Sequence, residues 1–142
     1  MKFTRLKILF ILILFASSSC KKSDIHPIPN IPVSFSFNIN MPEYSSIKAI
    51  GNSIIIYQGF YGYKRHGIII YRSSLSDIEV FDATSPEDLD VSVVLSKSVP
   101  IATCPTSKKE YILSNGGYSN SGGFPLKQYQ GSIAGDMIYI SN

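Results

Sequence analysis

Apolar and polar residues alternate from Val33 to Asn40, with Phe35, Phe37 and Ile39 all on the apolar side. Successive side chains of a strand point to opposite faces of the sheet, so a period of two predicts a half-buried strand here. We expect this strand to end by Pro42, because proline has no N–H to donate to a neighbouring strand.

Two isoleucine-rich runs follow, at residues 54–57 and 67–71. Both are β-branched and short, which is typical of buried strands. The connection between them, residues 58–66, is rich in glycine and aromatic residues. The pattern therefore predicts a long hairpin with an aromatic connection.

The remaining pattern is also strand-like. Short apolar runs occur at 78–81, 111–113, 126–133 and 137–140, with turn signals between the later ones, whereas residues 82–104 form a less regular excursion. No window keeps a 3.6-residue period. We therefore predict an all-β fold of seven or more short strands with little or no helix, and both sandwich and small-barrel architectures fit.

The N-terminus has the pattern of a targeting segment. A basic start is followed by an apolar run at residues 8–16, which is shorter than the roughly 20 residues that a membrane-spanning helix needs and fits a signal peptide. Serines lead into Cys20, and two lysines follow. This resembles a bacterial lipobox, although Ser17 stands where leucine is usual. An ordinary signal peptide with a chance cysteine is the alternative.

The lipobox resemblance implies a division of the chain. A signal peptide would cover residues 1–19, a lipidated Cys20 and a proline-rich tether residues 20–32, and one β domain residues 33–142. Two or more acyl chains anchor a protein stably, so we expect the membrane as a partner, reached through the N-terminal lipid. The expected location is the cell envelope, on the periplasmic side or the cell surface, with the outer membrane favoured.

The charge and the scarcity of certain residues exclude several classes. The formal net charge of +3 comes from the leader, because the chain from Cys20 onward has ten basic and ten acidic residues. A nucleic-acid partner is therefore not expected, since binding phosphates needs a basic surface. Two cysteines and two histidines are too few for a zinc-finger array or a disulfide scaffold.

Four segments resemble parts of Rieske [2Fe–2S] domains, in the family's order and spacing. Residues 80–87, VFDATSPE, resemble the first ligand loop, and residues 104–116, CPTSKKEYILSNG, resemble the second. Residues 124–129, FPLKQY, are similar to the start of the closing strands, and residues 67–72 to the hairpin before the first loop. The resemblance covers residues 30–142 and implies a Rieske-like small antiparallel sandwich or barrel with an irregular two-loop excursion.

The ligand positions depart from the family. A Rieske cluster is held by two thiolates on one iron and two imidazoles on the other. The resemblance places Ser85 and Glu87 at the first pair of ligand positions and Cys104 and Ser107 at the second, so only Cys104 keeps its ligand type. Lys108 stands where the family has glycine. The resemblance thus implies a degenerate site without a cofactor, in a protein with a binding or structural role.

The alternative is an electron-transfer protein that keeps a [2Fe–2S] cluster or another metal at Glu87 and Cys104. An enzyme is not expected, because His26 lies in the tether and His66 stands alone, so no Ser-His-acid arrangement can be built. Cys104 is either a relic or packing thiol, which we favour, or a reactive thiol.

Two further groups of residues have both a functional and an ordinary interpretation. Glu87, Asp88 and Asp90 could do acid–base work or hold calcium, but a solvated acidic loop is the favoured interpretation. The aromatic connection offers a possible contact loop for a protein or glycan partner, against cross-strand packing as the favoured alternative. Its candidate contact residues are Phe60, Tyr61 and Tyr63.

Overall fold

The structure, a computed structural model, describes residues 25–96 and 100–142, and all its paired strands are antiparallel. The strands are β1 (Ser34–Asn38), β2 (Ser53–Ile56), β3 (Ile68–Arg72), β4 (Ile78–Asp82), β5 (Val94–Leu95), β6 (Ile101–Thr103), β7 (Glu110–Ile112), β8 (Gln128–Ala134) and β9 (Met137–Ser141). The predicted all-β class is confirmed, and so is the hairpin at 54–57 and 67–71, which forms as β2 and β3.

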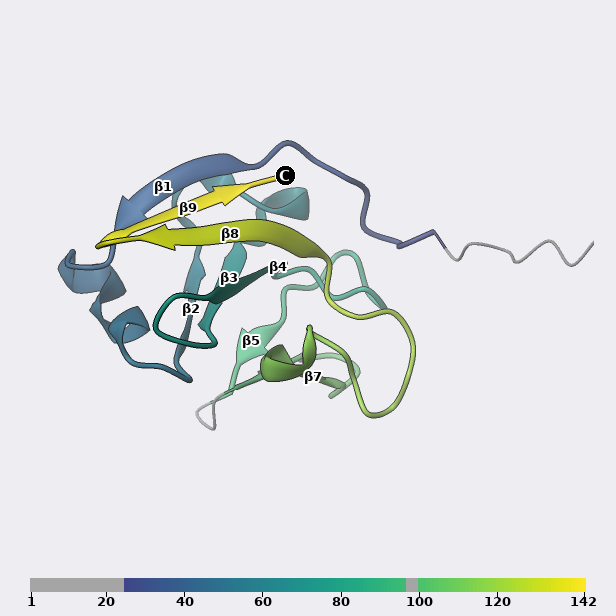
Figure 1. Ribbon diagram of the computed structural model, residues 1–142. Helices are drawn as coiled ribbons and strands as arrows, with labels where there is room; N and C mark the ends of the chain where they lie inside the picture. Colours follow the sequence, from purple (N-terminus) through teal and green to yellow (C-terminus); the bar gives the residue numbers. More distant parts are fainter. Residues whose placement is uncertain (1–24, 97–99) are drawn as a thin grey trace, which may run out of the picture.

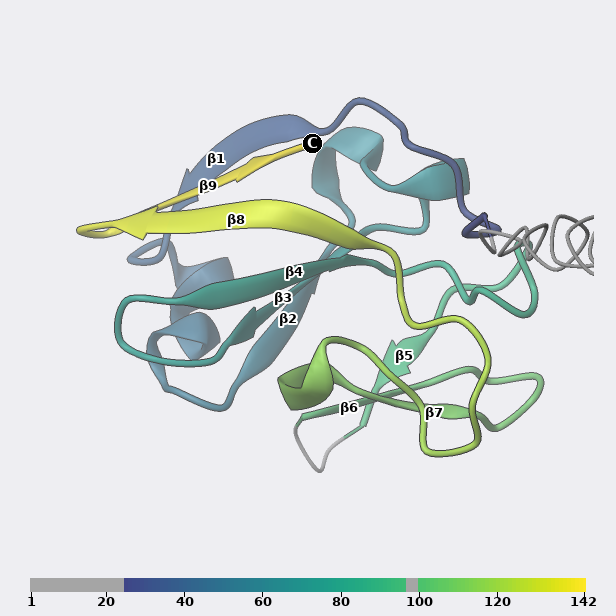
Figure 2. The same cartoon turned by 45° about the vertical axis from the view of Figure 1, so that its right-hand side comes forward.

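The strands form two sheets. One has six strands in the order β1-β9-β8-β4-β3-β2, and the other has three in the order β5-β6-β7. The larger sheet curls so that β1, β9 and β8 lie over β2, β3 and β4, while the small sheet lies on the opposite side (Figures 1 and 2). The predicted two-loop excursion is therefore the region that carries the small sheet.

Strand β8 bends where it passes from one partner to the next. Its start, Gln128 and Tyr129, pairs with β4, and residues 130–134 pair with β9. Gly131 sits at this point, where a Cβ would lie 2.4 Å from a methyl carbon of Val80. Glycine is needed here because any side chain would separate β8 from β4.

Two hydrophobic clusters fill the layers. The residues of β3 alternate between them, with Ile68 and Ile70 inside the curl of the large sheet and Ile69 and Tyr71 against the small sheet. All four side chains are buried. This is why the apolar run of β3 is unbroken: a strand covered on both faces has no polar side.

The described residues contain 3-10 turns but no α-helix. These turns are η1 (Pro42–Lys48), η2 (Gln58–Phe60), η3 (Tyr63–Arg65) and η4 (Leu113–Asn115). Strand β1 already ends at Asn38, and Pro42 begins η1, where its missing N–H costs no bond. Among the described residues, no helix is long and apolar enough to cross a membrane.

The proline-rich segment before β1 differs from the expected solvated tether. Ile28 is buried, and the His26 ring makes a 2.9 Å hydrogen bond with the Pro125 carbonyl oxygen. His26 also contacts Phe124 edge-on. Residues 26–28 therefore pack on the domain, because an apolar side chain and a ring with two polar atoms both find partners there. The predicted signal peptide and Cys20 lie outside the described residues.

Candidate functional site

The first loop leaves β4 at Asp82, which fixes its direction. The buried Asp82 carboxylate accepts hydrogen bonds from the Tyr129 hydroxyl at 2.8 Å and from the backbone N–H groups of Tyr63 at 2.6 Å and Thr84 at 2.8 Å. Burial and the Asp82 charge raise the pKa of Tyr129, so its hydroxyl keeps the proton it donates. The loop is also held by the pairing of Thr84 with Ser92.

The second loop is the turn between β6 and β7. The backbone N–H of Lys108 donates to the Cys104 carbonyl oxygen, and that of Cys104 donates to the Lys109 carbonyl oxygen, both at 2.9 Å. Lys108 adopts a φ of 61°, a left-handed conformation that glycine adopts without strain. The position where the resembled family has glycine is thus one whose backbone favours it.

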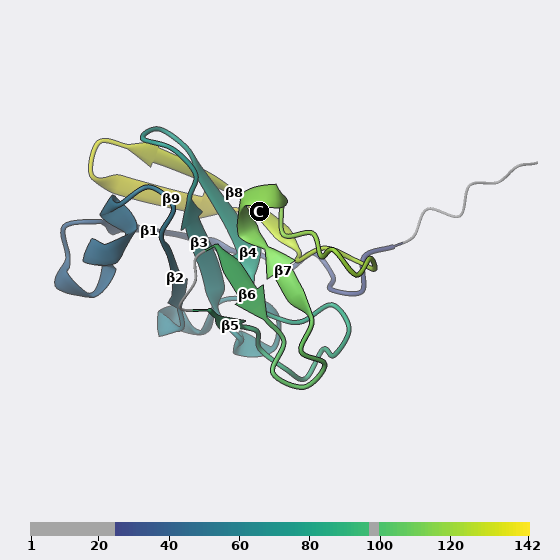
Figure 3. The ribbon, with the colours of Figure 1, turned by 90° about the horizontal axis from the view of Figure 1, so that it is seen from below.

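The two loops meet at the predicted ligand positions. Ser85 and Cys104 are both buried, and hydrogen bonds from Ser85 and Ser107 reach the Cys104 sulfur. Thr106 Oγ1 lies 3.2 Å from the same sulfur, and Ser85 Oγ lies 3.5 Å from the Tyr111 hydroxyl. In Figure 3, the loop after β4 and the β6–β7 turn lie at the same end of the molecule. Three of the four predicted positions therefore share one polar cluster.

Glu87, the fourth position, points to a different partner. Its carboxylate forms an ion pair with the Lys109 ammonium, and the Lys109 side chain is only 7% exposed. The ammonium also lies 6.0 Å from the centre of the Tyr111 ring. This ion pair links the first loop to the second, beside the polar cluster around Cys104.

The surroundings of Cys104 favour its thiolate. Burial raises the pKa of the thiol, but hydrogen bonds donated by the Ser107, Ser85 and Thr106 hydroxyls and by the Ser107 backbone N–H outweigh this effect and lower the pKa to about 6. The side chain has no exposed surface. The sulfur is thus electronically activated but closed to bulky reagents.

The donors at the four positions do not match a Rieske cluster. Such a cluster needs two thiolates and two imidazoles, whereas these positions offer one sulfur, two hydroxyls and one carboxylate. Hydroxyl and carboxylate oxygens are hard donors, and the sulfide-bridged iron pair favours soft thiolates and imidazoles. Ser85 and Ser107 are also already bonded to Cys104. The residues present therefore do not fit a Rieske [2Fe–2S] cluster.

His66 and the acidic residue Asp90 lie near this site without joining it. The His66 ring is 3.0 Å from Thr84 Oγ1, so it contacts the first loop one residue before Ser85. Asp90 pairs with Lys64 and lies in the solvent, as a surface acid does. Within residues 25–96 and 100–142, no three His, Cys, Asp or Glu side chains come together as a metal site.

The predicted aromatic contact loop divides into packed and exposed residues. Tyr61 stacks on Phe35 with ring centres 4.0 Å apart, and the Tyr63 N–H is bound by Asp82. Phe60 is 70% exposed, and the Arg65 guanidinium lies 5.3 Å from its ring centre. Packing therefore occupies Tyr61 and fixes the backbone of Tyr63, and only Phe60 presents a large free surface.

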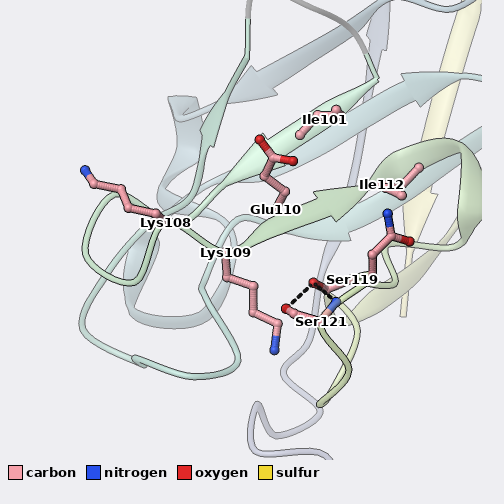
Figure 4. Close-up of a pocket in the computed structure, with 8 residues that line it drawn as sticks. Ile101, Lys108, Lys109, Glu110, Ile112, Ser119 and Ser121 are labelled. Atoms are coloured by element: carbon pink, nitrogen blue, oxygen red, sulfur yellow. Dashed lines mark hydrogen bonds between the residues drawn. The ribbon is translucent and has the colours of Figure 1, made fainter.

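A shallow hollow of about 280 Å³ lies beside the second loop, between β6, β7 and the 119–121 turn (Figure 4). The ammonium groups of its two lysines do not point to a common place. Lys108 extends away from the other lining residues and bonds the Pro105 carbonyl oxygen, and Lys109 is paired with Glu87. The hollow thus offers charges of both signs, and its two lysines are already engaged.

Three residues that hold the site together were not singled out from the sequence: Asp82, Lys109 and Tyr111. Asp82 is a charged residue at the end of a strand, where the sequence pattern favours a solvent-exposed side chain. Its partner Tyr129 lies 47 positions away in the chain. Lys109 follows Lys108 directly, and the local sequence does not distinguish the two lysines. For Tyr111 the apolar pattern did predict a strand, and a buried tyrosine hydroxyl usually has a partner.

Comparison with known proteins gives structural similarities only. No family model and no curated protein matches the chain. A protein designated the small subunit of an NADH-dependent nitrite reductase from Mycobacterium tuberculosis is 11% identical, over 80% of this chain and 97% of its own, with a TM-score of 0.47.

Two ferredoxins give similar values. The ferredoxin of carbazole 1,9a-dioxygenase from Nocardioides aromaticivorans IC177 is 10% identical, over 78% of this chain and 97% of its own, with a TM-score of 0.48. The ferredoxin of Sphingomonas yanoikuyae B1 is 16% identical, over 66% and 88%, with a TM-score of 0.46. Similarity at this level does not assign the chain to a family.

Proposed function

We propose that the chain is a lipid-anchored envelope protein whose Rieske-like domain holds its two ligand loops together without an iron–sulfur cluster. The domain serves a binding or structural role and is not an enzyme. The anchor is the lipid on Cys20, and the membrane is the partner that it reaches. The observation that carries the proposal is that the two loops are joined by their own side chains, with Ser85 Oγ 3.5 Å from the Tyr111 hydroxyl and Glu87 ion-paired with Lys109.

The contacts between the loops support this assignment of roles. A cluster would cross-link the loops through four bonds to iron. Here the cross-links are the contact of Ser85 with the Tyr111 hydroxyl and the ion pair of Glu87 with Lys109, beside the buried Cys104. Ser85 is buried and the Lys109 side chain is 7% exposed, whereas the Glu87 carboxylate remains accessible, so the contact of Ser85 is the better shielded from water of the two. The residues at the ligand positions thus have a structural use of their own.

A second candidate is a metal or electron-transfer protein that keeps a [2Fe–2S] cluster or another metal. The low pKa of Cys104 favours it, because thiolate is the form that binds metals. The ion pair of Glu87 with Lys109 speaks against it, since a carboxylate held by an ammonium is a poor ligand.

Rebuilding the ligand set tests the assignment of the positions. Ser85→Cys, Glu87→His and Ser107→His restore two thiolates and two imidazoles together with Cys104, and Lys108→Gly relaxes the positive φ. After reconstitution with iron and sulfide, we expect a visible charge-transfer spectrum from this variant and none from the wild type treated alongside. A folded variant that stays colourless would contradict the assignment of these four positions.

The anchor is tested separately. We expect a fatty-acid probe fed to cells to label the wild type and to miss Cys20→Ala, because the Cys20 sulfur would carry the lipid. Cys104→Ala is the matched control and should label fully, since Cys104 is buried in the domain. Labelling of Cys20→Ala, with the protein still in the membrane fraction, would show that the lipobox interpretation is wrong.

A further inference from the structure

Two hollows lie next to each other on the surface around η1. The first, of about 200 Å³, lies against Phe35 of β1, and the second, of about 330 Å³, follows β2 as far as Tyr57. Both are lined by Tyr44, Ile56 and Gln58, so the two hollows are adjacent. We call this feature the aromatic groove. It contains none of the residues of the polar cluster around Cys104.

Aromatic rings from separate segments line the aromatic groove. Phe35 stacks on Tyr61 with ring planes 13° apart, and Phe37 packs on Tyr44 with ring centres 4.5 Å apart. Tyr57 is 56% exposed at the far end. The other four rings pack on one another in pairs, so Tyr57 is the ring that a ligand can reach, and an exposed ring beside a hollow is a candidate ligand site.

The polar groups of the groove are side chains at its rim. The Tyr44 hydroxyl donates to Gln58 Oε1 at 3.1 Å. The Gln58 amide nitrogen and the exposed Glu43 carboxylate have no protein partner among the described residues. No lysine, arginine or histidine lines either hollow. The groove therefore offers donors, acceptors and one negative charge, which disfavours an anionic ligand.

From this combination we propose that the aromatic groove binds a neutral carbohydrate. The C–H faces of sugar rings are apolar and pack on aromatic rings, and their hydroxyls can donate to Glu43 and accept from the Gln58 amide. A few placed polar groups among aromatic walls fix the orientation of such a ligand. The inference does not depend on whether the loops hold a cluster.

The test uses the purified full chain in a zwitterionic, sugar-free detergent on an array of oligosaccharides. The array carries neutral glucose-, mannose- and galactose-based chains and matched chains built from uronic acids. We expect binding to at least one neutral series and none to the acidic ones. Tyr57→Ala and Gln58→Ala should each weaken that binding about tenfold. Tyr57→Ala removes a ring that stacks on the sugar, and Gln58→Ala removes a hydrogen bond to one of its hydroxyls.

Phe60→Ala is the matched control, because Phe60 is an exposed aromatic residue of the same connection but lines neither hollow. It should bind like the wild type. Tyr57 and Gln58 are exposed and belong to neither hydrophobic cluster, so both variants should melt close to the wild-type temperature. Binding to no neutral chain, a preference for acidic chains, or neutral binding that both variants leave unchanged would each overturn the proposal.

Discussion

At the scale of single residues, Cys104 is the point where the two loops meet. Its sulfur has no exposed surface, yet three hydroxyls and a backbone N–H surround it. A buried thiol in apolar surroundings would hold its proton more tightly, so the polar contacts decide its state. A sulfur bonded in this way stabilises the fold most when it is ionised.

This gives a pH dependence with a definite sign. The pKa of Cys104 is about 6 in the folded protein against 9.0 for an ordinary thiol, so its contribution to stability is full above about pH 9 and is lost as the pH falls towards 6. We expect the free energy of unfolding of the wild type, relative to Cys104→Ser, to rise between pH 6 and 9. Denaturant titrations of both proteins measure it, and a flat or falling difference would contradict the low pKa.

Residue-level roles were only partly predictable. The four ligand positions were placed by resemblance, and the structure brings Ser85, Cys104 and Ser107 together. Asp82 was not found, because its role depends on Tyr129, whose position in space the local pattern does not contain. The sequence placed Ser85 only at a ligand position, and the structure shows it buried, with its hydroxyl 3.5 Å from that of Tyr111 in the small sheet.

At the scale of elements, the two loops act as one unit. Lys109 is nearly buried and joins the β6–β7 turn to Glu87 of the first loop, whereas the neighbouring Lys108 bonds a carbonyl oxygen of its own turn. The two adjacent lysines therefore differ in their contacts: Lys109 binds a residue of the first loop, whereas Lys108 binds only its own turn.

Hydrogen exchange can separate the two lysines. In Lys109→Met we expect the backbone amides of residues 83–92 and 104–109 to exchange about fivefold faster, because an ion pair that links the loops is lost. Strands β3 and β9 should be unaffected. Lys108→Met is the control and should leave the first loop unchanged. Equal effects of the two substitutions would show that the ion pair does not link the loops.

The strands themselves were the most predictable part of the fold. Strand β1 follows from the period of two, and β2 and β3 follow from β-branched runs. Strand β5 and the division of β8 between two partners were not predicted. Both depend on which strand lies alongside, and a local pattern carries no such information.

At the scale of the whole molecule, two hydrophobic clusters share β3 and β4 as their common wall. The small sheet that carries the second loop is fixed to this wall by buried residues such as Phe81, Ala102 and Leu113. Apolar burial therefore helps to position both loops in addition to the contacts between them. Under the proposed function, this apolar wall takes over the role of a metal in holding the loops in place.

The most direct test of this account is the iron and acid-labile sulfide content of the wild-type protein, purified without exposure to air. We expect neither in stoichiometric amount and no visible absorption, because the four positions supply one sulfur and three oxygen donors, with Glu87 held by Lys109. Two irons and two sulfides per chain, with a charge-transfer spectrum, would contradict the account and favour the electron-transfer alternative.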